Sequence, residues 1–279
     1  MNDAAVAAGE RWRLMVEAEH AQSDSVRERG DAPSDSWAPF TERFRPSLDT
    51  SDPIALRLLK EVEPRHTVLD VGAGGGRVAL PASVQCKRVV AVEPSAAMGA
   101  TLEEEARRHQ RDNISLVAST WEEAEVEPAD VVMCVQVLYT VRDIVGFIRK
   151  LEAHARERAL VVLGENPPYT QSNPLWPIVH GQERLKLPSL RELIPLLWDM
   201  GIYPDLEMLP AQEPRGFESR ENALQQTRNR LMLESGGEGE RRLNAALDDA
   251  LEEVDGRFVI RGAPTFYPGL VSWRPRRSP

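Results

Sequence analysis

Short apolar runs alternate with longer stretches of mixed polarity through the middle of the chain. The runs are β-branched and apolar, as expected of buried parallel strands. The stretches between them repeat apolar residues at helical spacing, as in Ile144, Phe147, Ile148 and Leu151. This alternation predicts an α/β fold with a parallel, doubly wound sheet. The predicted strands are 67–70, 88–93, 114–118, 130–135 and 159–163, and the clearest helices are 95–109 and 144–151.

The N-terminal part of the chain has a different pattern. Residues 4–29 carry Trp12 and Val16 at helical spacing and predict a helix with a narrow apolar face. Residues 31–52, the strap, combine prolines with three aromatic residues and show no regular period. Such a segment either covers the edge of the domain or closes over its cleft as a lid. After it, Asp52 and a proline at the first helical position predict the start of a helix that ends before residue 64.

The C-terminal part of the chain predicts an irregular segment, a kinked helix and two last strands with an insertion between them. Residues around 176–184 read as a loop, and Ser189 with Glu192 forms a capping box for a helix that Pro195 should kink. The insertion contains two helical patterns, the second with an apolar face from Leu243 to Val254. The remaining predicted elements are strands 205–209 and 270–273 and helix 219–233. The expected organisation is a helix and strap or lid over 1–52, an α/β domain of 53–210 with 266–279, and a helical cap over 211–265.

A glycine-rich loop follows the first predicted strand and is the most informative stretch of the chain. It places glycines at 72, 74 and 76 after Asp70, with a helix expected to begin near Arg77. Glycine suits a turn over which a ligand approaches the backbone. A dinucleotide fingerprint needs a small residue at 77, and a phosphate loop needs a lysine next to serine or threonine, so Arg77 and Val78 disfavour both.

The pattern Asp70-x-Gly72-x-Gly74-x-Gly76 resembles motif I of the class I S-adenosylmethionine-dependent methyltransferases. The resemblance implies a Rossmann-like, seven-stranded, mostly parallel sheet with an antiparallel last strand. It also implies S-adenosylmethionine as the cofactor, with Asp70 holding its ammonium group. The loop residues expected under its methionine part are Val71, Gly72, Ala73 and Gly74.

Further expected cofactor contacts follow from the same resemblance. Glu93 ends the second strand, as an acid that binds the two ribose hydroxyls does in that family, and Pro94 and Met98 complete the local motif. Thr120 stands where the family often has an acid near the adenine, so backbone groups near Trp121, or Glu122, are the alternatives. The fourth strand ends at Val135 and Gln136, where the family has its fourth motif.

The run Asn166-Pro167-Pro168-Tyr169 is similar to the signature of enzymes that methylate adenine or glutamine amide nitrogen. In those enzymes the run follows the fourth strand, whereas here five predicted strands precede it. A proline-rich loop at the edge of the cleft is therefore the favoured interpretation.

Composition narrows the expected partners. The chain of 279 residues has 34 basic and 44 acidic residues and a net charge of -10, which disfavours nucleic acid. Its two cysteines form no CxxC or Cys/His cluster, so a reducing compartment and no structural metal are expected. No run approaches the length of a membrane span, and we expect a soluble, cytoplasmic protein without a membrane partner.

The resemblance implies transfer of a methyl group from S-adenosylmethionine to an O, N or C nucleophile of a small molecule. If the acceptor needs a general base, the candidates at the mouth of the cleft are His180, Tyr139 and Glu165. A catalytically inactive protein that binds the cofactor as a sensor or partner subunit is the alternative. A nicotinamide dehydrogenase is disfavoured by Arg77.

Overall fold

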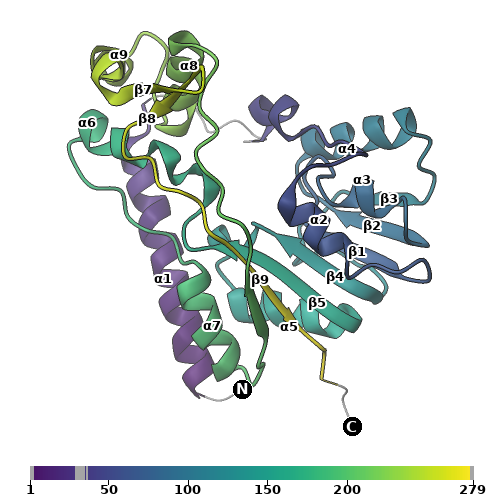
Figure 1. The fold of residues 1–279 in the computed structure, drawn as a ribbon. Coiled ribbons are helices and arrows are strands. Elements are labelled where there is room, and N and C mark those ends of the chain that lie inside the picture. The colour runs from purple at the N-terminus through teal and green to yellow at the C-terminus, as the bar shows by residue number, and fades with distance from the viewer. Residues whose placement is uncertain (1–2, 29–34, 36, 277–279) are drawn as a thin grey trace.

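The computed structural model describes residues 3–28, 35 and 37–276 and contains the predicted sheet (Figure 1). Its strand order is β3-β2-β1-β4-β5-β9-β6, in which β9 runs antiparallel to both its neighbours and the five strands from β3 to β5 are parallel. The expected fold, a mostly parallel seven-stranded sheet, is confirmed. The strands are β1 (Thr67–Val71), β2 (Arg88–Val92), β3 (Ile114–Val117), β4 (Ala129–Val135), β5 (Ala155–Gly164), β6 (Asp205–Met208) and β9 (Pro268–Trp273).

Helices cover both faces of the sheet. One buried cluster joins the sheet to α1 (Asp3–Val26), α5 (Ile144–His154) and α7 (Leu190–Asp199), and a second joins the other face to α2 (Pro53–Leu59), α3 (Ala79–Ala82) and α4 (Ala96–Arg108). The central strands are mostly buried and apolar, as expected where both faces are covered, whereas the edge strand β6 is exposed. The carboxyl ends of the parallel strands therefore form the edge at which a ligand can bind.

Side-chain caps fix where the helices begin. Asp52 accepts from the Ile54 N–H at 3.0 Å and Ser95 from the Met98 N–H at 3.1 Å, and the predicted capping box of Ser189 is present. The helix expected to begin near Arg77 is α3, which starts at Ala79 and contains four residues. The chain before it is held in turns by its glycines.

A second lobe, the upper lobe, consists of residues 168–180 and 211–265 and lies at the top left of Figure 1. Its elements share a buried cluster that includes Trp176, Leu243 and Leu247. The expected loop around 176–184 is wrong for its first part, because a short helix over residues 176–180 buries Trp176 against the lobe. These elements are η4 (Pro168–Leu175), α6 (Trp176–His180), α8 (Arg220–Arg230), α9 (Glu238–Ala250), β7 (Leu251–Val254) and β8 (Arg257–Ile260).

The predicted helical face from Leu243 to Val254 is interrupted. Helix α9 ends at Ala250, and β7 pairs with β8 in an antiparallel hairpin that leaves Val254 exposed. The two residues of the hairpin turn, Asp255 and Gly256, have φ of 50° and 74°. Asp-Gly is a strong two-residue hairpin signal, and here it prevails over the helical pattern before it.

Helix α1 connects the two lobes. The indole N–H of Trp12 donates to the Val141 carbonyl at 2.9 Å beside the sheet, while Val26 packs against the upper lobe. Just beyond the helix, the Glu28 carboxylate accepts from the backbone N–H groups of Glu234 and Gly239, at 3.1 and 2.7 Å. The N-terminal half of α1 is thus bound beside the sheet, and the chain just after its C-terminal end is bound to the first turn of α9 and the loop before it.

Candidate functional site

Asp70 lies one residue before the end of β1 and is the residue on which the candidate cofactor site depends. Its carboxyl is 2% exposed, and its Oδ2 atom has no hydrogen-bond partner. Burial raises the pKa of Asp70 to about 7. A hydrogen bond from the Ala79 N–H lowers the pKa, and the charge of Glu93 raises it by a smaller amount. A buried, half-satisfied carboxyl at a strand end fits a cationic ligand group, which would restore its ionised form.

The loop after β1 leaves room for such a ligand. Gly74 has a φ of 56°, and a Cβ built on it would meet no atom within 4 Å. Val71 and Ala73 are buried beside it, so the loop presents backbone rather than side chains to the open space. The predicted loop residues therefore fit the methionine part of S-adenosylmethionine.

Glu93 follows β2 and contacts this loop directly. Its two oxygens accept from the backbone N–H groups of Gly74, at 2.7 Å, and Ser95, at 2.8 Å. Burial raises the pKa of Glu93, although these two N–H groups lower it. Each oxygen keeps a free lone pair, so the carboxylate is oriented and still able to accept from two hydroxyls. Met98 is buried behind it, and Pro94 is exposed.

The strap lies on α4, next to these groups. Asp35 accepts from the Ser95 hydroxyl at 2.9 Å and from the Ala97 N–H at 3.0 Å, and its pKa is lowered, chiefly by the Ala97 N–H. Its charge also faces Glu93. Nothing in the sequence singled out Asp35, because its partners lie 60 residues away. The part of the strap at 31–34 and at 36 lies outside the described residues.

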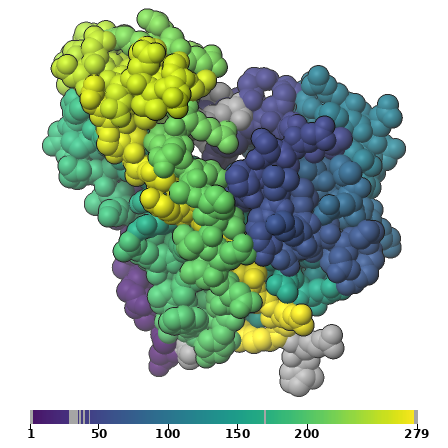
Figure 2. Space-filling model, in the orientation of Figure 1, coloured from purple at the N-terminus to yellow at the C-terminus, as the bar shows by residue number. Residues whose placement is uncertain are grey.

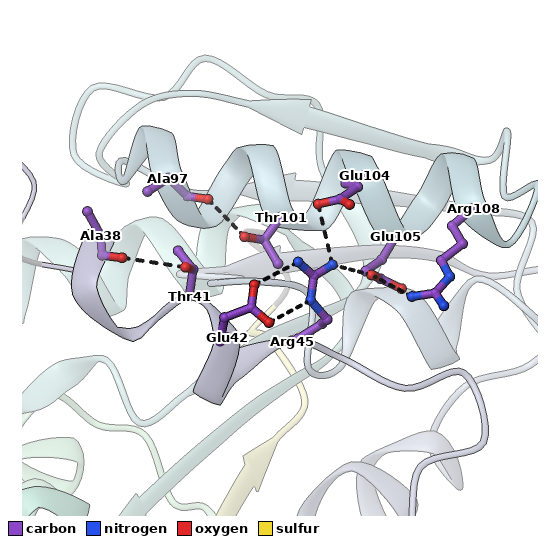
Figure 3. Close-up of polar contacts among 9 residues, drawn as sticks. All are labelled: Ala38, Thr41, Glu42, Arg45, Ala97, Thr101, Glu104, Glu105 and Arg108. Atoms are coloured by element: carbon purple, nitrogen blue, oxygen red, sulfur yellow. Dashed lines mark hydrogen bonds and ion pairs between the residues drawn. The ribbon is translucent and has the colours of Figure 1, made fainter. Parts of the chain in front are cut away.

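Arg45 fastens the next turns of the strap, η1 (Ala38–Phe40) and η2 (Glu42–Phe44), to the same helix. Figure 3 shows its guanidinium reaching Glu42 within the strap and both Glu104 and Glu105 on α4. Glu105 is 2% exposed, so this contact is largely shielded from water. The aromatic residues of the strap pack on one another, since Trp37 makes edge contacts with the rings of Phe40 and Phe44.

The strap also touches the glycine loop. A Cβ on Gly75 would lie 2.7 Å from the carbonyl oxygen of Phe44, so glycine is needed there because the strap backbone passes close by. Arg77 bonds to Asp52 at the end of the strap and donates to the Gln136 side chain at 3.2 Å. Arg77 thus links the strap to Gln136, a predicted cofactor contact that directly follows Val135 and has a φ of 59°.

In the region predicted to bind adenine, the Trp121 side chain points into the core. Trp121 is buried, and its indole N–H donates to the Phe147 carbonyl at 3.3 Å in the core. Lys150 donates to the backbone carbonyls of Trp121 and Glu122, at 2.6 and 3.1 Å. Thr120 and Glu122 are exposed. Adenine binding in this region stays a prediction.

The three candidate bases are each engaged by the protein. The Tyr139 hydroxyl accepts from the Gly164 N–H at 2.7 Å and donates to the Asn166 carbonyl at 3.4 Å. Glu165 is paired with Arg191. His180 contacts the Leu231 carbonyl through Nε2 at 3.0 Å, and burial lowers its pKa. None of them is assigned as a base by this geometry.

The space-filling view shows the surface hollowed between the upper lobe and the part of the chain that carries the strap and α4 (Figure 2). Among the described residues, no group of His, Cys, Asp or Glu side chains is arranged to hold a metal ion. The helices of this described part also include none that is long and apolar enough to cross a membrane.

Comparison with known proteins places the chain in a family. The model of the methyltransferase domain matches residues 39–204. A ubiquinone biosynthesis O-methyltransferase of Rickettsia akari (strain Hartford) is 30% identical over 99 residues, which cover 34% of this chain and 38% of that protein.

Solved structures agree in fold. The YcgJ protein of Bacillus subtilis has a TM-score of 0.54 at 17% identity, with 80% of this chain and 98% of that chain covered. A putative methyltransferase of Bacillus halodurans C-125 has a TM-score of 0.55 at 14% identity, with 82% and 100% covered. By its domain match and its fold, the chain belongs to the class I S-adenosylmethionine-dependent methyltransferases.

Proposed function

We propose that the protein transfers the methyl group of S-adenosylmethionine to an O, N or C nucleophile of a small molecule. The observation that carries the proposal is the buried Asp70 carboxyl with its unpartnered Oδ2, placed beside an open glycine loop. The match to an O-methyltransferase of ubiquinone biosynthesis supports a small-molecule acceptor, although it covers about a third of this chain.

The residues of the chain have separate parts in this proposal. The cofactor supplies an electrophilic methyl group on its sulfonium. Asp70 would hold the ammonium group and Glu93 the ribose hydroxyls, which fixes the position of the methyl group relative to the strand ends. The strap and the upper lobe would exclude water from both sides of the hollow.

Catalysis in this proposal rests on alignment rather than on a dedicated base. A displacement at a sulfonium methyl needs an in-line nucleophile, and correct placement of two reactants is itself a large contribution to rate. Tyr139, Glu165 and His180 already have partners in the protein, which supports this choice.

The proposed organisation assigns the strap of the 1–52 segment to covering the cofactor and the 211–265 insertion to covering the acceptor. Contact between them supports this assignment, since the Arg230 guanidinium of α8 lies 5.4 Å from the centre of the Phe40 ring. The acidic net charge supports a partner other than nucleic acid.

Titration calorimetry with S-adenosylhomocysteine tests the cofactor half of the proposal, with Asp70→Asn as the variant expected to weaken binding. Methyl transfer from labelled S-adenosylmethionine to small-molecule alcohols, phenols, amines and activated carbons tests the other half. Binding without transfer to any of them would favour a sensor or partner subunit. Absence of binding would refute the proposal as a whole.

A further inference from the structure

A cavity of about 160 Å³ lies between α1, the turn after β5 and the loop that follows α6. It is separate from the glycine loop and contains none of the predicted cofactor contacts. Its volume resembles that of a cavity able to hold one benzene ring, and its lining is mostly polar. The lining residues are Glu19, Asn166, Pro167, Thr170, Asn173, Glu183, Arg184, Leu185, Lys186 and Leu187.

The position of the cavity relates it to the acceptor side of the proposed reaction. The wall residue Asn166 accepts through its carbonyl from the Tyr139 hydroxyl, and Tyr139 follows the end of β4. The strands β1, β4 and β5 are neighbours in the sheet, so the end of β5 lies two strands from the glycine loop, about 10 Å away. A molecule in this cavity would thus approach the strand ends from the side opposite Glu93.

A buried ion pair forms the inner wall. Arg184 donates to Glu19 Oε1 through two nitrogens, at 3.1 and 2.8 Å, and the two side chains are 7% and 4% exposed. Ser23 donates to the same oxygen at 3.1 Å, and the guanidinium lies 4.5 Å from the centre of the Trp176 ring. A buried pair of this kind contributes little net stability.

The polar groups that remain are suited to hydrogen bonding with an uncharged molecule. The Asn166 amide forms no side-chain hydrogen bond in the described part of the chain, and Asn173 uses only its oxygen, which accepts from Arg184 at 3.4 Å. Glu19 and Arg184 form an ion pair, and Glu183 and Lys186 add one charge of each sign, so the lining carries no net formal charge. A ligand with a net charge would therefore enter a site without a charge to balance it.

We infer that this cavity binds the methyl acceptor and that the acceptor is a small polar molecule without net charge, selected by the Glu19–Arg184 pair and the two amides. The inference rests on the proposed function. It names a class of acceptor that is much smaller than a prenylated quinone and is neither an ionised carboxylic acid nor a protonated amine.

The test uses benzamide, benzoate and benzamidinium, which have nearly the same shape and differ in charge. Binding of each to the full chain is measured by ligand-observed NMR in the presence of [methyl-13C]S-adenosylmethionine. We expect benzamide to bind at least about tenfold more tightly than either ion, with a through-space contact between its protons and the labelled methyl group. The cofactor affinity is measured separately by calorimetry, so that a failure of the proposed function is recognised on its own.

Charge variants of the pair provide the decisive comparison. In Glu19→Gln the wall keeps the positive charge of Arg184, and the preference should move to benzoate; in Arg184→Met it should move to benzamidinium. The double variant carries no charge at either position and should keep the preference for benzamide, which controls for damage to the fold, as does thermal unfolding of each variant.

Three results would overturn the inference. No binding of any probe would show that the cavity is not a ligand site. Affinities that do not depend on the charge of the probe, or that keep their order in Glu19→Gln, would remove the role of the pair. Binding without contact to the labelled methyl group would separate this cavity from the reaction.

Discussion

The affinity for the cofactor should depend on pH through Asp70. Burial raises the pKa of this carboxyl to about 7, so much of it is protonated below neutral pH in the free protein. The ammonium group of the cofactor favours the ionised form and lowers the pKa in the complex. Binding therefore releases a proton, and the affinity should rise as the pH rises toward and past 7.

The magnitude follows from the pKa. At pH 5.5 a carboxyl with a pKa of about 7 is ionised to about 3%, and at pH 7.5 to about 75%. If only the ionised form binds, the dissociation constant should be about 25-fold larger at the lower pH, equivalent to ~2 kcal/mol. Burial raises the pKa of Glu93 as well, which changes the affinity in the same direction.

The assay is titration calorimetry with S-adenosylhomocysteine from pH 5.5 to 7.5, in two buffers with different ionisation enthalpies. At pH 6.5 the difference between the two buffers should correspond to release of about 0.8 proton. Asp70→Asn should bind weakly and lose most of the pH dependence. An affinity that does not change over this range, or an Asp70→Asn variant with the slope of the parent, would refute the reasoning.

Three further predictions test other parts of the structure. Glu93→Ala should weaken binding of S-adenosylhomocysteine by on the order of 2–4 kcal/mol, measured by calorimetry, and an unchanged affinity would remove Glu93 from the site. Gly75→Ala, whose Cβ would lie 2.7 Å from the Phe44 carbonyl oxygen, should weaken docking of the strap by about 1–3 kcal/mol, and slower or unchanged tryptic cleavage of the strap would contradict this. In denaturant unfolding, Leu243→Ala should lower the free energy of unfolding by about 2–5 kcal/mol and Val254→Ala by less than ~0.5 kcal/mol; equal losses would argue for the continuous helix.

The sequence was sufficient for the sheet and for the placement of Asp70 and Glu93 at neighbouring strand ends, whereas their contacts with the cofactor stay a prediction. Strands such as β1 and β4 are continuous apolar runs with both faces buried, and the acids Asp70 and Glu93 come directly after such runs or within them. Local signals of this kind do not depend on distant parts of the chain. Helix starts were equally predictable, because the caps Asp52 and Ser95 act within three residues of their own positions.

The rest of the site depends on contacts between distant segments. Asp35 meets α4, and Glu19 meets Arg184 across 165 positions in the sequence, so neither pairing leaves a local pattern. The upper lobe was predicted less well for the same reason. Trp176 lies in a segment rich in proline, and only packing against α8 and α9 stabilises its helical turns.

Helix α1 sets how the molecule can admit its ligands. Its 24 residues make a helix about 36 Å long, whose N-terminal half, with Trp12, packs in the core beside the sheet, while Glu28, just beyond its C-terminal end, accepts from Glu234 and Gly239. The upper lobe cannot rotate away from the sheet as a hinged unit, because this motion would break helix α1 or pull Trp12 out of the core. The described part of the strap is not tied to the core by a helix in this way. Its residues Arg45 and Asp35 bind α4 through side-chain contacts that can break one at a time. Ligands should therefore enter and leave the hollow on the strap side, while the upper lobe stays at a fixed distance from the strand ends.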